Sequence, residues 1–135
     1  MTDAVIAVDP GRDKCGVAVV SRLEGVRWKN VVPAAEMAAV VAGLAERHAI
    51  DTVVLGDRTG RKDAMASLAA LRPGGRELTV SLVDEHRSTD EARARYWRDH
   101  PPRGLARLLP VTLRVPPVPV DDYVAVIIAE RYFNR

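Results

Sequence analysis

The fold of this chain is decided by Ala4-Val5-Ile6-Ala7-Val8-Asp9-Pro10-Gly11 and the nearby Gly16-Val17-Ala18-Val19-Val20. An uninterrupted run of β-branched and small apolar residues predicts a strand covered on both faces, as in the centre of a sheet. The first run ends in one carboxylate, Asp9, before a Pro-Gly turn. In α/β sheets, ligands bind in the crevice outside the carboxyl ends of the strands. We therefore expect Asp9 to lie in a ligand-binding crevice.

The size and composition of the chain predict one domain spanning residues 1–135. With 135 residues, of which 47% are hydrophobic, it can bury a core of its own. A single cysteine, Cys15, excludes an internal disulfide and a multi-cysteine zinc site. No signal peptide or long apolar run precedes the first predicted strand, so we expect a cytoplasmic protein with no membrane partner.

The positive charge of the chain is mostly arginine. The formal net charge is only +2, and Lys14, Lys29 and Lys62 are the only lysines among 20 basic residues. The planar guanidinium group matches the geometry of phosphate, which favours a nucleic-acid partner. GC-rich codon usage produces the same bias without any function, so composition alone leaves both explanations open.

The order of the predicted elements indicates an α/β fold with a five-stranded mixed sheet flanked by helices. Three strands joined by short turns come first, as in an antiparallel meander. Strands that alternate with helices follow, as in parallel β-α-β units. The predicted strands are residues 4–9, 16–21, 26–32, 52–56 and 78–83, and the predicted helices are 35–48, 63–71, a helix ending near 99 and a helix beginning near 121.

Two segments of the second half carry specific local signals. Ser88-Thr89-Asp90-Glu91 has the Ser-x-x-Glu pattern of a capping box, which predicts a helix start at Ser88. Residues 101–119 contain six of the nine prolines and are predicted to form a loop or an extended segment.

Carboxylates follow apolar runs at three separate places. Asp9 ends the first strand, Asp84 and Glu85 follow the fifth, and Asp121 and Asp122 open the last helix. If the first and fifth strands run parallel on either side of the fourth, their carboxyl ends open on the same edge, with neighbouring strands about 4.8 Å apart. Crowded carboxylates need a cation, and Mg²⁺ or Mn²⁺ accept such oxygen ligands. Two such ions about 3.5–4 Å apart can catalyse phosphodiester cleavage.

Each acid also has a purely structural explanation. Asp9 is a common residue before a Pro-Gly turn. Asp121 is suited to cap the last helix, and Asp122 to interact with its positive end. Asp84 and Glu85 can form an exposed strand end paired with Arg87. The occurrence of all three groups in one chain is what favours a catalytic cluster.

Three segments of the chain resemble the motifs of one known family. They are Asp9-Pro10-Gly11 with the run that begins at Gly16, Val83-Asp84-Glu85-His86-Arg87, and Val120-Asp121-Asp122-Tyr123-Val124. These motifs are similar to those of the YqgF/RuvX family, and the similarity spans nearly the whole chain. That family is itself similar to RuvC-type Holliday-junction resolvases and is implicated in maturing the ends of pre-16S ribosomal RNA.

The resemblance implies an RNase H-like fold and a metal-dependent nuclease. It marks Asp9, Glu85 and Asp121 as catalytic residues and as ligands of Mg²⁺ or Mn²⁺, with Asp122 as a further candidate ligand. The substrate would be structured RNA, branched DNA or single-stranded DNA, cut by a monomer or a homodimer. The family's Asp-Glu-Arg segment is here Asp84-Glu85-His86, with the arginine one position later. This departure leaves a second interpretation open, a nucleic-acid-binding module of the same fold with weak or absent catalysis.

The most basic region begins beside Glu85. Between His86 and Arg114, seven arginines stand against three acids, a formal excess of four positive charges. We expect this region to guide a phosphate backbone toward the metal ions, although a solvated helix face would look the same. Tyr96 and Trp97 are candidates for stacking on an unpaired base or for core packing. The predicted nucleic-acid-binding residues are Arg58, Arg87, Arg93, Arg95, Arg98, Arg103 and Arg107.

Overall fold

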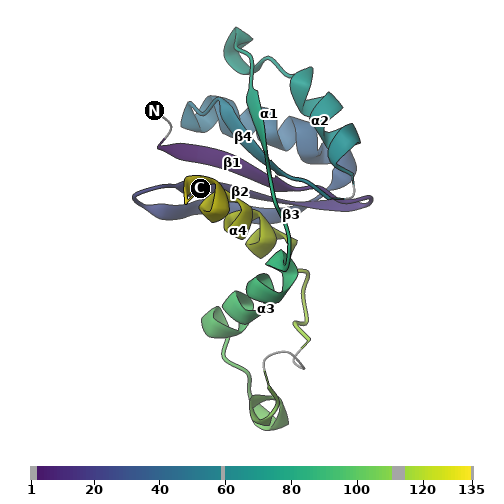
Figure 1. Ribbon diagram of the computed structural model, residues 1–135, viewed down its shortest axis with the longest axis vertical. Coiled ribbons are helices and arrows are strands. Elements are labelled where there is room, and N and C mark those ends of the chain that lie inside the picture. The colour runs from purple at the N-terminus through teal and green to yellow at the C-terminus, as the bar shows by residue number, and fades with distance from the viewer. Residues whose placement is uncertain (1–2, 59, 111–114, 135) are drawn as a thin grey trace.

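The protein, seen here in a computed structural model, is built around a five-stranded mixed sheet (Figure 1). The structure describes residues 3–58, 60–110 and 115–134. The strand order is β3-β2-β1-β4-β5, in which β1 pairs antiparallel with β2 and parallel with β4. This confirms the predicted meander followed by two parallel pairs. The strands are β1 Ala4–Asp9, β2 Lys14–Ser21, β3 Gly25–Pro33, β4 Thr52–Gly56 and β5 Thr79–Val83.

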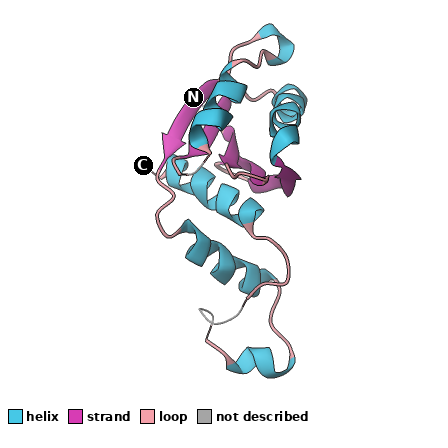
Figure 2. Cartoon of the chain, turned by 90° about the vertical axis from the view of Figure 1, so that its right-hand side faces the viewer, coloured by secondary structure: helices cyan, strands magenta, loops and turns pink. Residues whose placement is uncertain are grey.

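Helices cover both faces of the sheet. α1 and α2 lie on one face, α4 lies on the other, and α3 lies along the outside of α4 (Figures 1 and 2). Within the described residues, no helix combines the length and the hydropathy that crossing a lipid bilayer requires. The helices are α1 Met37–His48, α2 Arg61–Ala69, α3 Ser88–Asp99 and α4 Asp121–Phe133, and the short 3₁₀ turns are η1 Ala34–Glu36, η2 Pro73–Gly75 and η3 Gly104–Leu108.

The central strand β1 supplies both cores, because successive side chains of a strand point to opposite faces. Ile6 and Val8 are fully buried on the side of α1 and α2, whereas Val5 and Ala7 are fully buried on the side of α4. α4 in turn buries seven consecutive residues, Tyr123 to Ala129, between the sheet and α3. A helix buried almost all round is typical of a central core helix. Its first turn is thereby fixed next to the end of β1.

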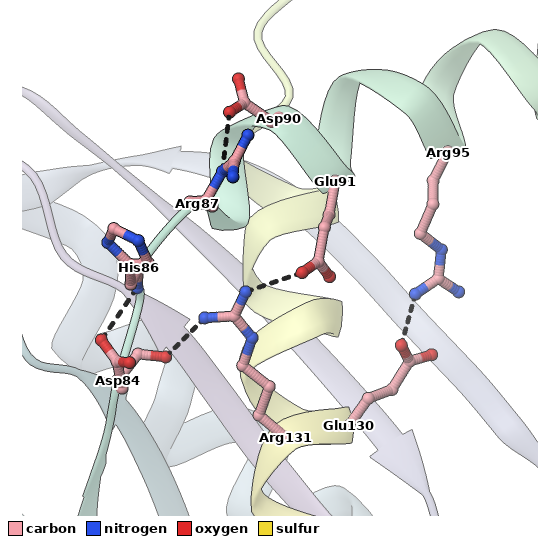
Figure 3. A network of polar contacts seen from close by, with 8 residues as sticks. All are labelled: Asp84, His86, Arg87, Asp90, Glu91, Arg95, Glu130 and Arg131. Atoms are coloured by element: carbon pink, nitrogen blue, oxygen red, sulfur yellow. Dashed lines mark hydrogen bonds and ion pairs between the residues drawn. The ribbon is translucent and has the colours of Figure 1, made fainter.

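α3 is fastened to α4 by polar contacts along its length (Figure 3). Arg131 of α4 donates hydrogen bonds of 2.8 Å to the Asp84 carbonyl oxygen and to Glu91 Oε1. Arg95 of α3 pairs with Glu130. At the other end of α3, the Tyr123 hydroxyl donates a hydrogen bond of 2.9 Å to Asp99 Oδ2. These contacts bind the segment after β5 to the C-terminal helix.

Both helices of the second half begin where the sequence predicts, but their predicted caps require correction. The capping box at Ser88 is wrong: Arg87 is the N-cap, with φ 58°, and no side chain caps the helix. A side-chain cap requires extended backbone at the N-cap, whereas here a tight turn, in which the Ser88 amide donates to the Glu85 carbonyl, leads directly into α3. Asp121 is not an N-cap either, since Val120 holds that position. The proline-rich segment contains η3, and residues 111–114 lie outside the described part of the chain.

Gly16 of β2 lets α4 approach the sheet. It pairs with Asp9, and a Cβ atom at this position would lie 1.8 Å from the Asp121 carbonyl oxygen. We predict that Gly16→Ala lowers the free energy of unfolding by about 1–3 kcal/mol, because the helix backbone must move away. Urea denaturation measures this change.

The matched control is Gly43→Ala on the exposed face of α1, where a Cβ atom would meet nothing within 4 Å. That substitution should stabilise the protein by up to about 1 kcal/mol, since alanine is the better helix former. Equal effects of the two substitutions would contradict the close approach at Gly16.

Candidate functional site

The fold brings the three predicted acids together at the carboxyl edge of the sheet. Asp9 is the last residue of β1, Glu85 follows β5 by two residues, and Asp121 is the first residue of α4. Asp9 and Glu85 lie within side-chain hydrogen-bonding distance, and the charge of Asp121 acts on Asp9. Glu85 is almost completely buried, at 3% exposure. Parallel pairing of β1, β4 and β5 explains the convergence, since it places the ends of all three strands on one edge.

Two strand glycines make room for these acids. Gly16 lies beneath the backbone of Asp121, and a Cβ atom at Gly56, the last residue of β4, would lie 2.0 Å from Glu85 Oε1. Sequence reasoning did not assign either glycine to the site. The available signal was a glycine inside a predicted buried strand, which marks a close approach by another group.

Glu85 is held in place by the segment that follows β4. The Glu85 amide donates a hydrogen bond of 3.2 Å to Asp57 Oδ1, and the Arg58 amide donates one of 3.2 Å to Glu85 Oε2. The Asp57 amide donates to the Val83 carbonyl oxygen at 3.1 Å. Asp57 and Arg58 therefore orient Glu85, a positioning role that sequence reasoning also did not assign.

Negative charge dominates the surroundings of Asp9. Burial, the hydrogen bond with Glu85, and the negative charges of Glu85 and Asp121 raise the pKa of Asp9 to about 9. Glu85 Oε1 and Asp121 Oδ2 are buried and accept no hydrogen bond from an amide, hydroxyl or amine of the described residues. The raised pKa favours the neutral form of Asp9 beside Glu85 at neutral pH. Crowded, partly desolvated carboxylates of this kind favour a neutral acid unless a cation joins them.

The two acids at the start of α4 have different surroundings. Lys14 Nζ lies 3.6 Å from Asp121 Oδ2, which is close enough for an ion pair but too far for a hydrogen bond. Both oxygens of Asp122 are engaged: Oδ1 accepts the Tyr123 amide and Oδ2 accepts a hydrogen bond of 3.2 Å from Lys29. Of the two residues, Asp121 is the one with an oxygen available toward Asp9.

The chemistry of the cluster fits a divalent cation. As the side chains stand, no three Asp, Glu, His or Cys residues in the described ranges 3–58, 60–110 and 115–134 are arranged as a complete metal centre. However, Asp9, Glu85 and Asp121 offer carboxylate oxygens, the ligands of Mg²⁺ and Mn²⁺, and two of these oxygens are buried without a hydrogen-bond donor. Deprotonation of Asp9 is the change that a cation would require.

Neighbouring groups of the predicted motif serve the turn before α3. Asp84 Oδ1 accepts the His86 amide at 2.9 Å, and Arg131 binds the Asp84 carbonyl oxygen (Figure 3).

Cys15 is buried, and burial raises the pKa of its thiol, which suits packing and not nucleophilic attack. Tyr96 is also buried, with its ring against Tyr123, so it belongs to the core.

The predicted nucleic-acid-binding arginines differ in their surroundings, because some of them form ion pairs within the protein. Arg87 pairs with Asp90 at 3.8 Å, and Arg95 pairs with Glu130 across the α3–α4 interface (Figure 3). Both guanidinium groups thus have an anionic partner within the protein. Arg58 lies beside Glu85, the arginines 93, 98 and 103 are exposed, and Arg107 lies in η3.

Comparisons with known proteins identify the fold. No protein-family model matches the chain, and no curated protein matches its sequence. Among solved structures, Thermus thermophilus RuvC is similar at a TM-score of 0.57 and 19% identity, with 93% of this chain and 90% of that chain covered. T. thermophilus RuvC in complex with a Holliday junction substrate is similar at a TM-score of 0.59 and 13% identity, with 98% and 96% covered. The chain therefore has the RNase H-like α/β fold.

The raised pKa of Asp9 predicts how the stability of the folded protein depends on pH. The Asp9 pKa is about 9 in the folded protein, against 3.8 as the ordinary value. Its contribution to stability is therefore complete below pH 4 and is lost progressively as the pH rises toward 9. In EDTA at pH 8, we expect Asp9→Asn to unfold at a higher temperature than wild type, by roughly 3–5 °C for each ~1 kcal/mol gained.

Thermal melts of both proteins between pH 5 and 9 measure this difference, because all other titrating groups are shared. The gap should widen as the pH rises. Asp51→Asn, an exposed substitution just before β4 at the opposite edge of the sheet, serves as control. A constant gap across the pH range, or an equal gain from the control, would show that Asp9 keeps an ordinary pKa.

Proposed function

We propose that this protein is a metal-dependent nuclease that hydrolyses phosphodiester bonds in nucleic acid. Its type would be that of the YqgF/RuvX family, with structured RNA such as the ends of pre-16S ribosomal RNA, or branched DNA, as substrate. One observation carries the proposal: carboxylates from three distant segments share a pocket in which two of their buried oxygens have no hydrogen-bond donor.

In this proposal, Asp9, Glu85 and Asp121 would hold one or two Mg²⁺ or Mn²⁺ ions. When bound, these ions lower the pKa of a water molecule and neutralise the charge that develops on the leaving oxygen. The backbone hydrogen bonds of Asp57 and Arg58 keep Glu85 directed into the pocket. Lys14 lies beside Asp121 and is half exposed, so it can turn toward a phosphate when the acids are neutralised.

Two further features support a nucleic-acid substrate. The chain shares its fold with RuvC, and one RuvC structure is a complex with a Holliday junction substrate. The cluster also lies at the open edge of the sheet, where a hollow of about 240 Å³ is lined by Asp9, Asp121 and residues 10–14. A phosphate group can reach the acids through this hollow.

The second candidate is a nucleic-acid-binding module without useful catalysis. It is favoured by the raised pKa of Asp9, since a neutral Asp9 is a poor metal ligand, and by His86 at the position of the family's arginine. The two candidates differ in whether a divalent ion displaces the proton of Asp9 and binds to the three carboxylates.

Cleavage assays separate the two candidates. Purified protein is incubated with a labelled four-way junction, single-stranded DNA and a pre-16S ribosomal RNA fragment, each with Mn²⁺ or EDTA. We predict Mn²⁺-dependent cleavage of at least one substrate and a loss of at least about 100-fold in rate for Asp9→Asn, since the charge that holds the ion is removed. Binding of the same substrate, measured by fluorescence anisotropy, should change by no more than about twofold.

Asp51→Asn again provides the matched control, because it removes one carboxylate at the opposite edge of the sheet. It should leave both cleavage and binding unchanged. Binding without Mn²⁺-dependent products from any of the three substrates would identify the protein as a binding module. Products that persist in Asp9→Asn would point to a contaminating nuclease.

A further inference from the structure

A continuous groove leads away from the acids toward α2. The hollow lined by Asp9 and Asp121 shares residues 10–12 with a larger hollow of about 430 Å³. That hollow shares Gly60 and Asp63 with a third, of about 360 Å³, which is lined by residues 58 and 60–63. The three hollows therefore adjoin one another from the candidate site, past the β1–β2 turn, to the first turn of α2, and together they are called the groove.

The floor of this groove is backbone. Gly60 has φ +86°, and a Cβ atom there would lie 3.6 Å from the amide nitrogen of Gly11. The β1–β2 turn and the β4–α2 connection thus touch through two glycines, with no side chain between them. Each hollow has about the volume of a site for one small ligand, which suits the successive nucleotides of one strand better than the two strands of a duplex.

The walls of the groove carry basic side chains that form no ion pair with the described residues, although Arg61 donates a hydrogen bond of 3.4 Å to the Asp57 carbonyl oxygen. Arg12 lines the first two hollows, and Arg58, Arg61 and Lys62 line the third. All four are exposed, and within the described residues none forms an ion pair. Lys14 also lines the first hollow, and the acids of the groove are Asp9, Asp13, Asp63 and Asp121, so five basic residues stand against four acidic ones. Beyond the candidate acids and Lys14, four basic residues stand against Asp13 and Asp63.

On the face of α3, Arg87 and Arg95 each have a carboxylate partner, whereas Arg93 and Arg98, and Arg103 after the helix, are exposed and form no ion pair with the described residues. The groove adds four more exposed basic side chains next to the candidate acids, with Asp13 and Asp63 lining the same hollows. The acids at one end accept a divalent ion, and the basic walls accept the phosphates that follow.

We propose that this groove binds the sugar–phosphate backbone of an unpaired substrate strand on one side of the scissile bond. Arg12, Arg58, Arg61 and Lys62 would contact its phosphates. The inference rests on the proposed nuclease function and adds a substrate class, since it requires a single-stranded segment next to the cleavage site. It also extends the expected contacts from the arginines of α3 to the start of α2.

Salt-dependent binding tests the groove. The double variant Arg12→Gln/Lys62→Gln is made in the Asp9→Asn background, so that the probe stays intact. The matched control is Arg47→Gln/Arg76→Gln, two exposed arginines near the other ends of β4 and β5. Fluorescein-labelled single strands of 20 nucleotides, one DNA and one RNA, and a blunt 20-base-pair duplex are titrated between 50 and 200 mM salt.

We expect the groove variant to bind the single strands about tenfold more weakly at 50 mM salt. The slope of log K against log salt should become shallower by about 1.4, or about 0.7 for each lost phosphate contact on a single strand. The control should stay within about twofold of the parent, and all variants should share its melting temperature. Groove and control variants with the same affinity and slope would overturn the proposal, and so would an equal or larger loss on the duplex.

The same substitutions in the protein with Asp9 intact separate this proposal from the proposed function. If the protein is a nuclease, Arg12→Gln/Lys62→Gln should raise KM by about tenfold and change kcat little, because the lost contacts lie outside the reacting centre. Weaker single-strand binding together with no cleavage by any variant would contradict the proposed nuclease function and support the proposed groove. Cleavage with an unchanged KM would do the reverse.

Discussion

Electrostatic repulsion among carboxylates at one edge of the sheet is the constraint on which this structure depends. Asp9, Glu85 and Asp121 are brought together by a fold whose hydrophobic burial outweighs the cost of crowding them. The protein answers the repulsion locally, through a raised pKa at Asp9 and ion pairs from Lys14 and Lys29 to the two acids of α4. Two buried oxygens still have no hydrogen-bond donor, Glu85 Oε1 and Asp121 Oδ2, the second of which has only the ion pair with Lys14. The crowded carboxylates lower the free energy of unfolding, and a bound cation at the same place would raise it again.

The helices divide the work of holding this arrangement. α4 contributes seven consecutive buried residues to one core, so Asp121 is carried by an element that cannot easily shift. Glu85 instead depends on backbone hydrogen bonds from the segment after β4. α3 leaves the site at once and rests on α4, where Arg131 joins it to the end of β5. Packing fixes one acid, and polar contacts fix another.

The sequence was sufficient for the fold and for the acids, but not for their surroundings. The apolar run of β1 predicted a central strand, and the alternation of elements predicted the parallel pairing that brings Asp9 and Glu85 together. The roles of Gly16 and Gly56 depend on which backbone passes above them, which local patterns do not contain. The capping box failed because Arg87 adopts a left-handed conformation imposed by the turn before it. The pairing of Arg95 with Glu130 is likewise a tertiary contact, invisible to a count of charges along the chain.

The position of α4 in the chain has a consequence for how the protein is made. The sheet is complete by Val83, but one of its two cores stays uncovered until residues 121–133 have been synthesised. A nascent chain emerging from the ribosome can therefore pair all five strands while only two of the three acids are in reach of each other. Docking of the final helix covers the exposed face and delivers the third acid in one event. A chain that lacks the docked α4 therefore cannot assemble the three acids.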